Sequence, residues 1–426
     1  MRVPNVSGKS AVSDSDAVLS GSSDFGWLSS LPAWQQPDWE DSVLVEQVRD
    51  EISTLPPLVR AEETNQFREL LAAVARGEST VVQAGDCAED FSETRPVCIA
   101  RKAELIDTIA KTLAIRSGTS VVRVGRIAGQ FAKPRSRPVE QVGDMELTAY
   151  RGHMVNSPEK HPGQRRPDPK RVLSGYWAAS AAMDAVHQHN ADRLDPGQRI
   201  WTSHEALLLD YELPMLRRTA EGKLLLTSTH WPWVGDRTRQ LDGAHIALLA
   251  EVRNPVACKV GPSVSEDELI RLCARLDPER EPGKLTLIAR MGAADVVERL
   301  ARLVSAVRTA GHPVIWLCDP MHGNTVNTSC GRKARVLNDL VDELHGFLKV
   351  VTVEGGVAGG LHLETTPAEV TECVATHADM FEAHSVHTSL CDPRLNPRQA
   401  VWLTSCWDAS PVAPDRSNDQ ISLWSF

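Results

Sequence analysis

The amino-acid sequence predicts an α/β protein, a (β/α)8 TIM barrel with an N-terminal helical extension. Three observations lead to this fold class. The chain has 426 residues, of which 42% are hydrophobic, and this is enough for one large barrel. From residue 80 onward, short β-branched runs alternate with amphipathic helical stretches, which is typical of parallel βα units. Eight such runs occur, and eight βα units predict a closed barrel.

The composition argues against several classes of protein. No run of about 18 apolar residues occurs, so we expect no membrane span. The formal net charge of −10 argues against general binding to nucleic acid or to anionic membranes. The nine cysteines are irregularly spaced and form no CxxC motif, which indicates a reducing, cytoplasmic setting. The N-terminus lacks a basic region followed by an apolar stretch, so no secretory signal is expected.

The two ends of the chain are predicted to lie outside the barrel. Residues 1–30 are rich in Ser, Asp and Gly and predict a flexible tail. Residues 31–78 form the extension, in which a Pro/Trp-rich start is followed by two helices within 43–76 that "TLPPL" separates. We assign the catalytic barrel to residues 79–410 and a C-terminal tail to 411–426.

Eight candidate strands follow one another along the barrel segment. They are "TVVQAGD" (80–86), "SVVRVGR" (120–126), "RIWTSHE" (199–205), "KLLLTST" (223–229), "PVACKVG" (255–261), "KLTLIAR" (284–290), "PVIWLCD" (313–319) and "VAGGLHLE" (357–364). Helical spacing of apolar residues is clearest at 100–115, 265–276 and 294–310. The run "VVTVE" (350–354) fits either a strand or a helix end. Residues 137–198, rich in Pro and Arg, predict a long excursion from the barrel.

The predicted strand ends carry polar and ionisable residues. In a barrel of parallel strands, the carboxyl ends of the strands line the active site. The residues at or just after these ends are Cys87, Arg126, His204, Glu205, His230, Lys259, Arg290, His322 and Glu364. So many polar groups at one rim predict an active site there.

One group of these residues has the chemistry of a metal site. Cys87, His322, Glu364 and Asp392 offer one thiolate, one imidazole and two carboxylates. This mixed set of donors suits a divalent transition metal such as Mn, Fe, Co or Zn. Because the four are scattered in the sequence, ordinary hydrogen-bonded rim residues are the alternative. A bare Cys87 nucleophile with His322 as its base is a further alternative, which the carboxylates weaken because they would raise the pKa of the thiol.

A second group of residues is cationic. It consists of Arg126, Lys133, Arg135, Arg237, Lys259 and Arg290. Several cations at one rim of an acidic protein predict anionic substrates, because guanidinium groups bind phosphate and carboxylate with two parallel hydrogen bonds. Ordinary surface ion pairs are the alternative for each cation taken singly.

Ten motifs, in order along the chain, resemble one known family. They are "QAGDCAEDF", "RVGRIAGQFAKPRS", "YRGHMVN", "WTSHEALLLDYE", "STHWPWVGDRTRQLDGAHIA", "NPVACKVGP", "LIARMG", "DPMHGNT", "GGLHLETTPAEVTEC" and "CDPRLNPRQA". Over roughly residues 32–407 they look like a class II, plant- and actinobacterial-type 3-deoxy-D-arabino-heptulosonate-7-phosphate (DAHP) synthase. The resemblance implies a (β/α)8 barrel that condenses phosphoenolpyruvate (PEP) with erythrose 4-phosphate and releases phosphate, the first step of the shikimate pathway.

The resemblance also implies roles for individual residues. Cys87, His322, Glu364 and Asp392 would bind a divalent metal, Mn or Co in the first place, with Fe, Zn or Cd as alternatives. The implied PEP contacts are Arg126, Asp236, Arg237, Lys259 and Arg290. The implied contacts to erythrose 4-phosphate are Lys133, Pro134, Arg135 and Ser136. Lys259 and Asp236 are expected to orient the attacking water, and Lys133 to donate a proton to the new alkoxide.

Two features depart from the family pattern. Asp236 stands where the family usually has Glu, and one methylene less would lengthen a contact to water. The segment between Ser136 and Trp201 looks shorter than in the feedback-regulated members, so we expect weak or absent inhibition by aromatic amino acids. In this respect the chain resembles the short subgroup that is tied to secondary metabolism such as phenazine formation.

Two other functions stay open on the sequence. An aminoDAHP synthase would use an amino analogue of the sugar phosphate with the same motifs. A non-catalytic barrel that regulates a partner, such as a chorismate mutase, would have lost a metal ligand or a PEP cation, and only the mild change at Asp236 is seen. The resemblance implies a homodimer or homotetramer in the cytoplasm, with no nucleic-acid or membrane partner.

Overall fold

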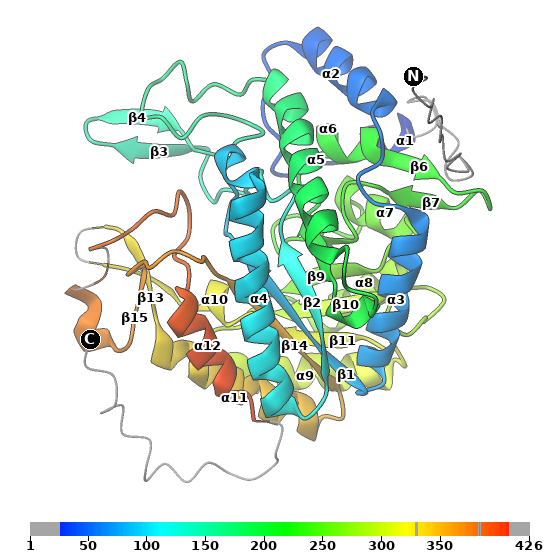
Figure 1. Cartoon of the computed structure of the whole chain (residues 1–426), viewed down its shortest axis with the longest axis vertical. Helices are drawn as coiled ribbons and strands as arrows, with labels where there is room; N and C mark the ends of the chain where they lie inside the picture. Colours follow the sequence, from blue (N-terminus) through cyan, green and yellow to red (C-terminus); the bar gives the residue numbers. More distant parts are fainter. Residues whose placement is uncertain (1–25, 329–330, 382, 384, 409–426) are drawn as a thin grey trace, which may run out of the picture.

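A closed barrel of eight parallel strands forms the centre of the molecule (Figure 1). The computed structural model describes residues 26–328, 331–381, 383 and 385–408. The barrel strands are β1 (Ser79–Gly85), β2 (Ser120–Arg126), β5 (Ile200–Glu205), β8 (Trp231–Val234), β9 (Val256–Val260), β10 (Leu285–Ala289), β11 (Ile315–Cys318) and β14 (Val357–Glu364). They follow the order β1-β14-β11-β10-β9-β8-β5-β2 around the barrel. The predicted (β/α)8 fold is confirmed.

Helices cover the outside of the barrel (Figure 1). The longer ones are α4 (Pro96–Ser117), α5 (Lys170–Asn190), α7 (Ala244–Glu251), α8 (Glu266–Leu276), α9 (Val296–Thr309), α11 (Leu337–Val353) and α12 (Pro397–Ser405). The sequence marks their ends: Pro96 opens α4 and Gly118 ends it with a left-handed φ of 70°. The ambiguous run 350–354 is the end of α11.

Seven of the eight predicted strands are barrel strands, and one prediction was wrong. The run 223–229 contains β7 (Leu224–Leu226), which pairs antiparallel with β6 (Leu216–Arg218) in a separate two-stranded sheet. The fourth barrel strand is β8, whose sequence holds Pro232 between two tryptophans. Because proline lacks the N–H that a central strand normally donates, this stretch did not look like a strand. The apolar run 223–229, which precedes β8, was therefore predicted as the fourth strand instead.

Aromatic side chains fill the barrel, and one helix of the extension covers its amino-terminal end. Trp201, Trp231 and Trp233 share one buried cluster with Phe67, a residue of α3 (Ala61–Ala75). The Phe67 ring lies 5.3 Å from that of Trp201 and 5.6 Å from that of Trp231. Full burial of such a side chain stabilises the fold by about 1.5–3 kcal/mol. With this end filled, the open end is the one where the strands finish.

The segment 137–198, predicted as a long excursion, contains a hairpin and a long helix in the structure. It begins with the hairpin of β3 (Val139–Val142) and β4 (Met145–Thr148), which projects sideways from the barrel in Figure 1. Its second half is α5, an ordinary barrel helix that precedes β5. The Pro- and Arg-rich stretch had masked the helical pattern that follows it.

A small sheet lies beside the finishing ends of the strands. It consists of β12 (Thr325–Asn327), β13 (Lys333–Val336) and β15 (Cys373–Val374). Strand β13 pairs antiparallel with β12 and parallel with β15. This side sheet joins the segment after β11 to the segment after β14, and both segments carry candidate site residues.

The predicted tails lie mostly outside the described residues. Residues 1–25 and the whole predicted tail 411–426 lie outside them, whereas Gly26–Ser29 form the short helix α1, with Leu28 buried. The extension continues with α2 (Ser42–Thr54) and α3. Across the described ranges, no helix combines the length and apolar character that a membrane crossing requires.

Lys284 is a buried lysine at the amino-terminal end of β10. Its Nζ donates to the carbonyl oxygens of Val252 and Asn254, at 2.5 and 2.7 Å. Burial lowers the pKa of this ammonium group from 10.5 to about 7, and Arg68 adds to the effect. Between these two pH values the unfolded chain holds a proton that the folded chain has lost.

We therefore predict that Lys284 makes the free energy of unfolding increase with pH. The slope reaches about 1.4 kcal/mol per pH unit between about pH 7 and pH 10. Urea denaturation at pH 7, 8 and 9 should show a smaller slope in Lys284→Met than in the parent protein. The exposed Lys349→Met is the control and should keep the parent slope. Equal slopes in all three proteins would contradict the prediction.

Candidate active site

Four side chains from different parts of the chain meet at the finishing end of the barrel. Cys87 follows β1, His322 lies in the short helix α10 (Pro320–Gly323) after β11, and Glu364 ends β14. Ligand atoms of Cys87, Glu364 and Asp392 lie within 4.8 Å of one another. The His322 Nε2 atom lies 3.1 Å from Glu364 Oε1. The structure thus brings together all four residues that the sequence proposed as metal ligands.

An ammonium group lies among these donor atoms. The Lys133 Nζ atom lies 2.7 Å from Cys87 Sγ, 3.3 Å from Glu364 Oε1 and 3.2 Å from Asp392 Oδ2. Three donors that converge on one positive charge form a place where a cation is stable. The thiolate, imidazole and carboxylate donors fit a divalent transition metal at this place.

The ionisation of the donors favours a metal ligand over a bare nucleophile at Cys87. Burial raises the pKa of the Cys87 thiol well above its usual range, and contacts with Cys391 and Glu364 raise it further. Lys133 opposes these effects only in part. A thiol in this setting is a weak nucleophile, whereas a bound divalent cation would deprotonate it.

Glu364 is ionised in spite of its burial. Burial opposes the charge, yet the charges of His322, Lys133 and Arg335 hold the pKa of this carboxyl well below its usual range. Its Oε1 faces Lys133 and His322, while Oε2 accepts from Arg335 at 2.8 Å. The two oxygens therefore have different partners.

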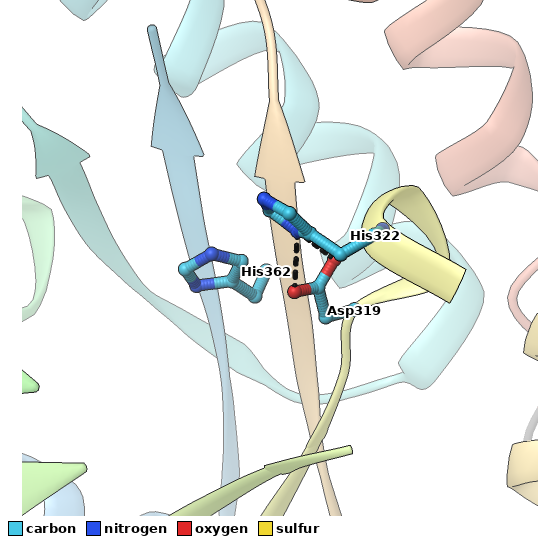
Figure 2. A group of neighbouring side chains, drawn as sticks. All are labelled: Asp319, His322 and His362. Atoms are coloured by element: carbon cyan, nitrogen blue, oxygen red, sulfur yellow. Dashed lines mark hydrogen bonds and ion pairs between the residues drawn. The ribbon is translucent and has the colours of Figure 1, made fainter. Parts of the chain in front are cut away.

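Asp319 fixes the orientation of the His322 ring, and the sequence analysis missed it. Figure 2 shows its carboxylate against the His322 ring, and Asp319 Oδ2 lies 2.7 Å from His322 Nδ1. The same carboxylate caps α10 by accepting from the backbone N–H of Met321. With Nδ1 held by Asp319, His322 presents Nε2 to Glu364 and to the metal position. The sequence feature that could have identified Asp319 is its place directly after a strand and three residues before His322.

His362 is near this pair but is occupied by other partners. Its ring lies on the other side of the Asp319 carboxylate in Figure 2, with no bond drawn to it. His362 Nε2 accepts from Arg126 at 2.6 Å, so Nδ1 carries the hydrogen that Gln83 Oε1 accepts. Burial, followed by the charge of Lys259, holds the pKa of this imidazole well below its usual range. A neutral ring with both nitrogens engaged does not compete for the metal.

Three of the predicted PEP cations surround the metal position. Lys259 Nζ donates to Asp319 Oδ2 at 2.9 Å and lies 3.3 Å from His322 Nδ1. Arg290 donates to the His322 carbonyl oxygen at 2.9 Å. Arg126 is fully buried and donates to Glu364 Oε1 at 3.2 Å. The cationic and metal-donor groups therefore form one continuous site.

The remaining cations lie further out on the same rim. Arg237 donates to the Ser136 hydroxyl at 2.7 Å and joins the loop after β8 to the "AKPRS" loop. Arg135 pairs with Glu140 at 3.0 Å, and its backbone N–H donates to Gln35 of the extension. Pro134 lies between Lys133 and Arg135 and is half-buried. Of the residues expected to bind erythrose 4-phosphate, Lys133 lies among the metal donors, and Pro134, Arg135 and Ser136 follow it along the same loop.

Asp236, expected to orient the attacking water, lies beside Arg290 at the rim. Its Oδ1 accepts from Arg239 at 2.9 Å and its Oδ2 accepts from Arg290 at 3.2 Å. Both carboxylate oxygens are thus engaged by guanidinium groups. In this arrangement Asp236 holds Arg290 in position.

Glu205 is a carboxylate that the sequence analysis placed at the rim but gave no role. Its Oε1 is buried and has no hydrogen-bond partner among the described residues. Burial raises the pKa of Glu205, while Lys259, Lys133 and Arg126 lower it in that order. A Cβ atom on Gly235 would lie 2.2 Å from Oε1, so any side chain there would push the Glu205 carboxylate aside. The carboxylate faces the same cations that the substrate would use.

Two histidines of the predicted rim do not belong to the site. His230 precedes β8 and lies at the opposite end of the barrel, where its ring packs 5.1 Å from that of Trp201. This error follows from the wrong fourth strand. His204 points away from the site, fully buried, and its Nε2 lies 2.8 Å from Glu212 Oε1.

Comparisons with known proteins agree with this geometry. The model of the Class-II DAHP synthetase family matches residues 25–196 and 188–406. The chain belongs to this family. A probable phospho-2-dehydro-3-deoxyheptonate aldolase of Pseudomonas fluorescens is 51% identical over 381 residues, covering 89% of this chain and 95% of that relative. The phospho-2-dehydro-3-deoxyheptonate aldolase of Streptomyces coelicolor is 38% identical, covering 87% and 93%.

A solved structure shares the fold of this DAHP synthetase family member. The phospho-2-dehydro-3-deoxyheptonate aldolase of Francisella tularensis aligns with a TM-score of 0.52, covering 87% of this chain and 96% of the other. The two sequences are 12% identical, so the likeness concerns the fold alone.

We predict that Asp319→Asn weakens metal binding without unfolding the barrel. An amide at this position cannot hold His322 through a charged hydrogen bond, and such changes typically reduce metal affinity about 10–100-fold. Titration of chelator-treated protein with Mn²⁺ measures the dissociation constant. Asp242→Asn, at a surface position after β8, is the control. An unchanged dissociation constant in Asp319→Asn would contradict this role.

Proposed function

We propose that the chain is a DAHP synthase, which condenses PEP with erythrose 4-phosphate to give DAHP and inorganic phosphate. The observation that carries the proposal is the shared position of metal donors and phosphate-binding cations. Lys259 and Arg290 both contact His322, one at the ring and one at the carbonyl oxygen. Membership of the class-II family supports the same reaction.

The metal proposed for this site is Mn or Co, held by Cys87, His322, Glu364 and Asp392. A mixed set of sulfur, nitrogen and oxygen donors accepts several divalent ions, so Fe, Zn or Cd could take the same place. When bound, the ion would polarise the aldehyde carbonyl of erythrose 4-phosphate as a Lewis acid. The surrounding side chains would bind the two substrates and orient the attacking water.

The reaction forms one carbon–carbon bond and breaks one carbon–oxygen bond. The methylene carbon of PEP bonds to the aldehyde carbon, and the aldehyde oxygen takes up a proton. The oxygen of a water molecule then bonds to the central carbon of PEP. Phosphate leaves that carbon with the electron pair of the broken bond, and the remaining hydroxyl loses its proton to give the ketone.

The cations of the rim bind the two anionic substrates. Lys259 and Arg290 are proposed to hold the phosphate and carboxylate of PEP, with Arg126 adding positive charge from below. Lys133, Pro134, Arg135 and Ser136 are proposed to receive erythrose 4-phosphate, with Arg237 next to Ser136. Burial lowers the pKa of the Lys133 ammonium group, but the charges of Glu364 and Asp392 help to hold it well above its usual range, which suits Lys133 to hydrogen-bond the aldehyde oxygen.

Glu205 is the carboxylate best placed to hold the attacking water. Its Oε1 has no hydrogen-bond partner among the described residues and Lys259 exerts the largest charge effect on it, whereas both oxygens of Asp236 are engaged by arginines. Burial raises the pKa of Glu205, which makes its carboxylate a stronger base for a water proton. We therefore propose Glu205 and Lys259 as the pair that orients the water, and Asp236 as a positioning residue for Arg290.

We also propose that the protein forms a homodimer or homotetramer in the cytoplasm and has a chorismate mutase partner. Its product would supply secondary metabolism of the phenazine kind. No contact in the described part of the chain favours an amino analogue of the sugar phosphate. The candidate ligands and cations are all present, which argues against a non-catalytic barrel.

We predict that chelator-treated protein releases phosphate from PEP only when Mn²⁺ and erythrose 4-phosphate are both added. The reason is that the carbon–carbon bond must form before water attacks the central carbon of PEP. A coupled assay for inorganic phosphate measures the rate. Omission of the metal and omission of the aldose are the two controls. Release of phosphate from PEP alone, or at full rate without metal, would exclude the proposed reaction.

Glu205 and Asp236 are predicted to respond differently to loss of charge. Glu205→Gln should lower kcat about 10²–10⁴-fold with little change in KM for PEP, because the base is lost and the cations remain. Asp236→Asn should mainly raise KM for PEP, because Arg290 loses its partner. Steady-state kinetics at saturating Mn²⁺ separates the two. If instead Asp236→Asn lowers kcat while Glu205→Gln leaves it unchanged, the roles are reversed.

A further inference from the structure

Arg335 is a fully buried arginine of β13 that lies behind the proposed metal site. It is 0% exposed, and its strand belongs to the side sheet outside the barrel. Nothing in its sequence context, "GRKARV", marks it as part of the site. Its contacts nevertheless reach three separate segments, and each of these segments carries one proposed metal ligand.

The first segment is the end of β14. One nitrogen of the guanidinium group, Nη1, donates to Glu364 Oε2 at 2.8 Å. The other oxygen of Glu364, Oε1, faces His322 and Lys133. Arg335 thus occupies one oxygen and leaves the other for the metal position, which favours a single Glu364 oxygen as ligand.

The second and third segments carry Asp392 and His322. Arg335 Nη1 also donates to the carbonyl oxygen of Pro393, the residue after Asp392. Arg335 Nε donates to Thr325 Oγ1 at 3.1 Å, and that hydroxyl donates to the carbonyl oxygen of Met321, next to His322. One planar group therefore holds three loops in a fixed relation.

We propose that Arg335 is a positioning residue that sets the geometry of the metal site through Glu364, Asp392 and His322. This inference rests on the proposed metal site and names a determinant of it that lies outside the barrel. A lysine at this position keeps the charge but, with a single nitrogen, cannot reach all three partners. Simple balance of the Glu364 charge would need only the charge, so the two explanations differ in what Arg335→Lys does.

The test compares metal binding in four proteins. They are the parent, Arg335→Lys, Arg335→Met and Arg217→Lys. Arg217 is the matched control because it is also buried and donates only to backbone carbonyl oxygens of the extension and of the loop after β5. The readouts are the dissociation constant for Mn²⁺ and the absorption of the Co²⁺-loaded protein, in which a Cys87 thiolate gives a charge-transfer band.

The expected result is a graded loss in the Arg335 variants. The Mn²⁺ dissociation constant should rise about tenfold in Arg335→Lys and about 100-fold in Arg335→Met, with a changed cobalt spectrum in both. The control Arg217→Lys should lower the melting temperature, while both metal readings keep the parent values. If Arg335→Met does not fold, Arg335→Lys decides alone.

Two results would overturn the inference, and they differ in what else they exclude. A dissociation constant within about twofold of the parent value and an unchanged spectrum in Arg335→Lys would show that the charge alone suffices. A parent protein that gives no thiolate–cobalt band would exclude the metal site itself, and the role of Arg335 with it.

Discussion

The buried charge of Glu364 is the constraint on which the rest of the site depends. A carboxylate removed from water is unstable unless positive groups and hydrogen bonds surround it. Here Arg126, Lys133, His322 and Arg335 supply them, and each comes from a different segment of the chain. The positions of β2, the "AKPRS" loop, α10 and β13 are therefore tied to one carboxylate at the end of β14.

The opposite end of the barrel is closed by apolar packing. Phe67 and the tryptophans fill the amino-terminal end, so the apolar core of the barrel lies below the site. The site itself is built from strand ends and loops, which can differ between proteins without disturbing that core. The DAHP synthetase family fold thus separates stability, at the base, from chemistry, at the rim.

The sequence singled out the residues that line the candidate site better than the residues that hold them in place. Cys87, His322 and Glu364 could be found because a strand end is visible as a pattern. Arg335 acts through contacts with residues far away in the sequence, and spacing carries no sign of such contacts. Asp319 is close to His322 in the sequence, but its contact with Lys259 is not visible there. Glu205 stood at a predicted strand end, yet the sequence does not show that its Oε1 is buried without a hydrogen-bond partner among the described residues. The wrong strand at 223–229 has a local cause, since Pro232 and two tryptophans disguise β8. That error also placed His230 at the wrong end of the barrel.

The exchange of Glu for Asp at position 236 is best understood through its neighbours. If Asp236 held the attacking water, the loss of one methylene would draw its carboxylate back from that water. Because Arg239 and Arg290 engage both oxygens, the shorter side chain instead shifts where the Arg290 guanidinium lies. A cation that binds a phosphate tolerates such a shift more readily than a base that must reach one proton. Glu205 keeps its full length and its free oxygen, and so the chemistry can persist while position 236 varies.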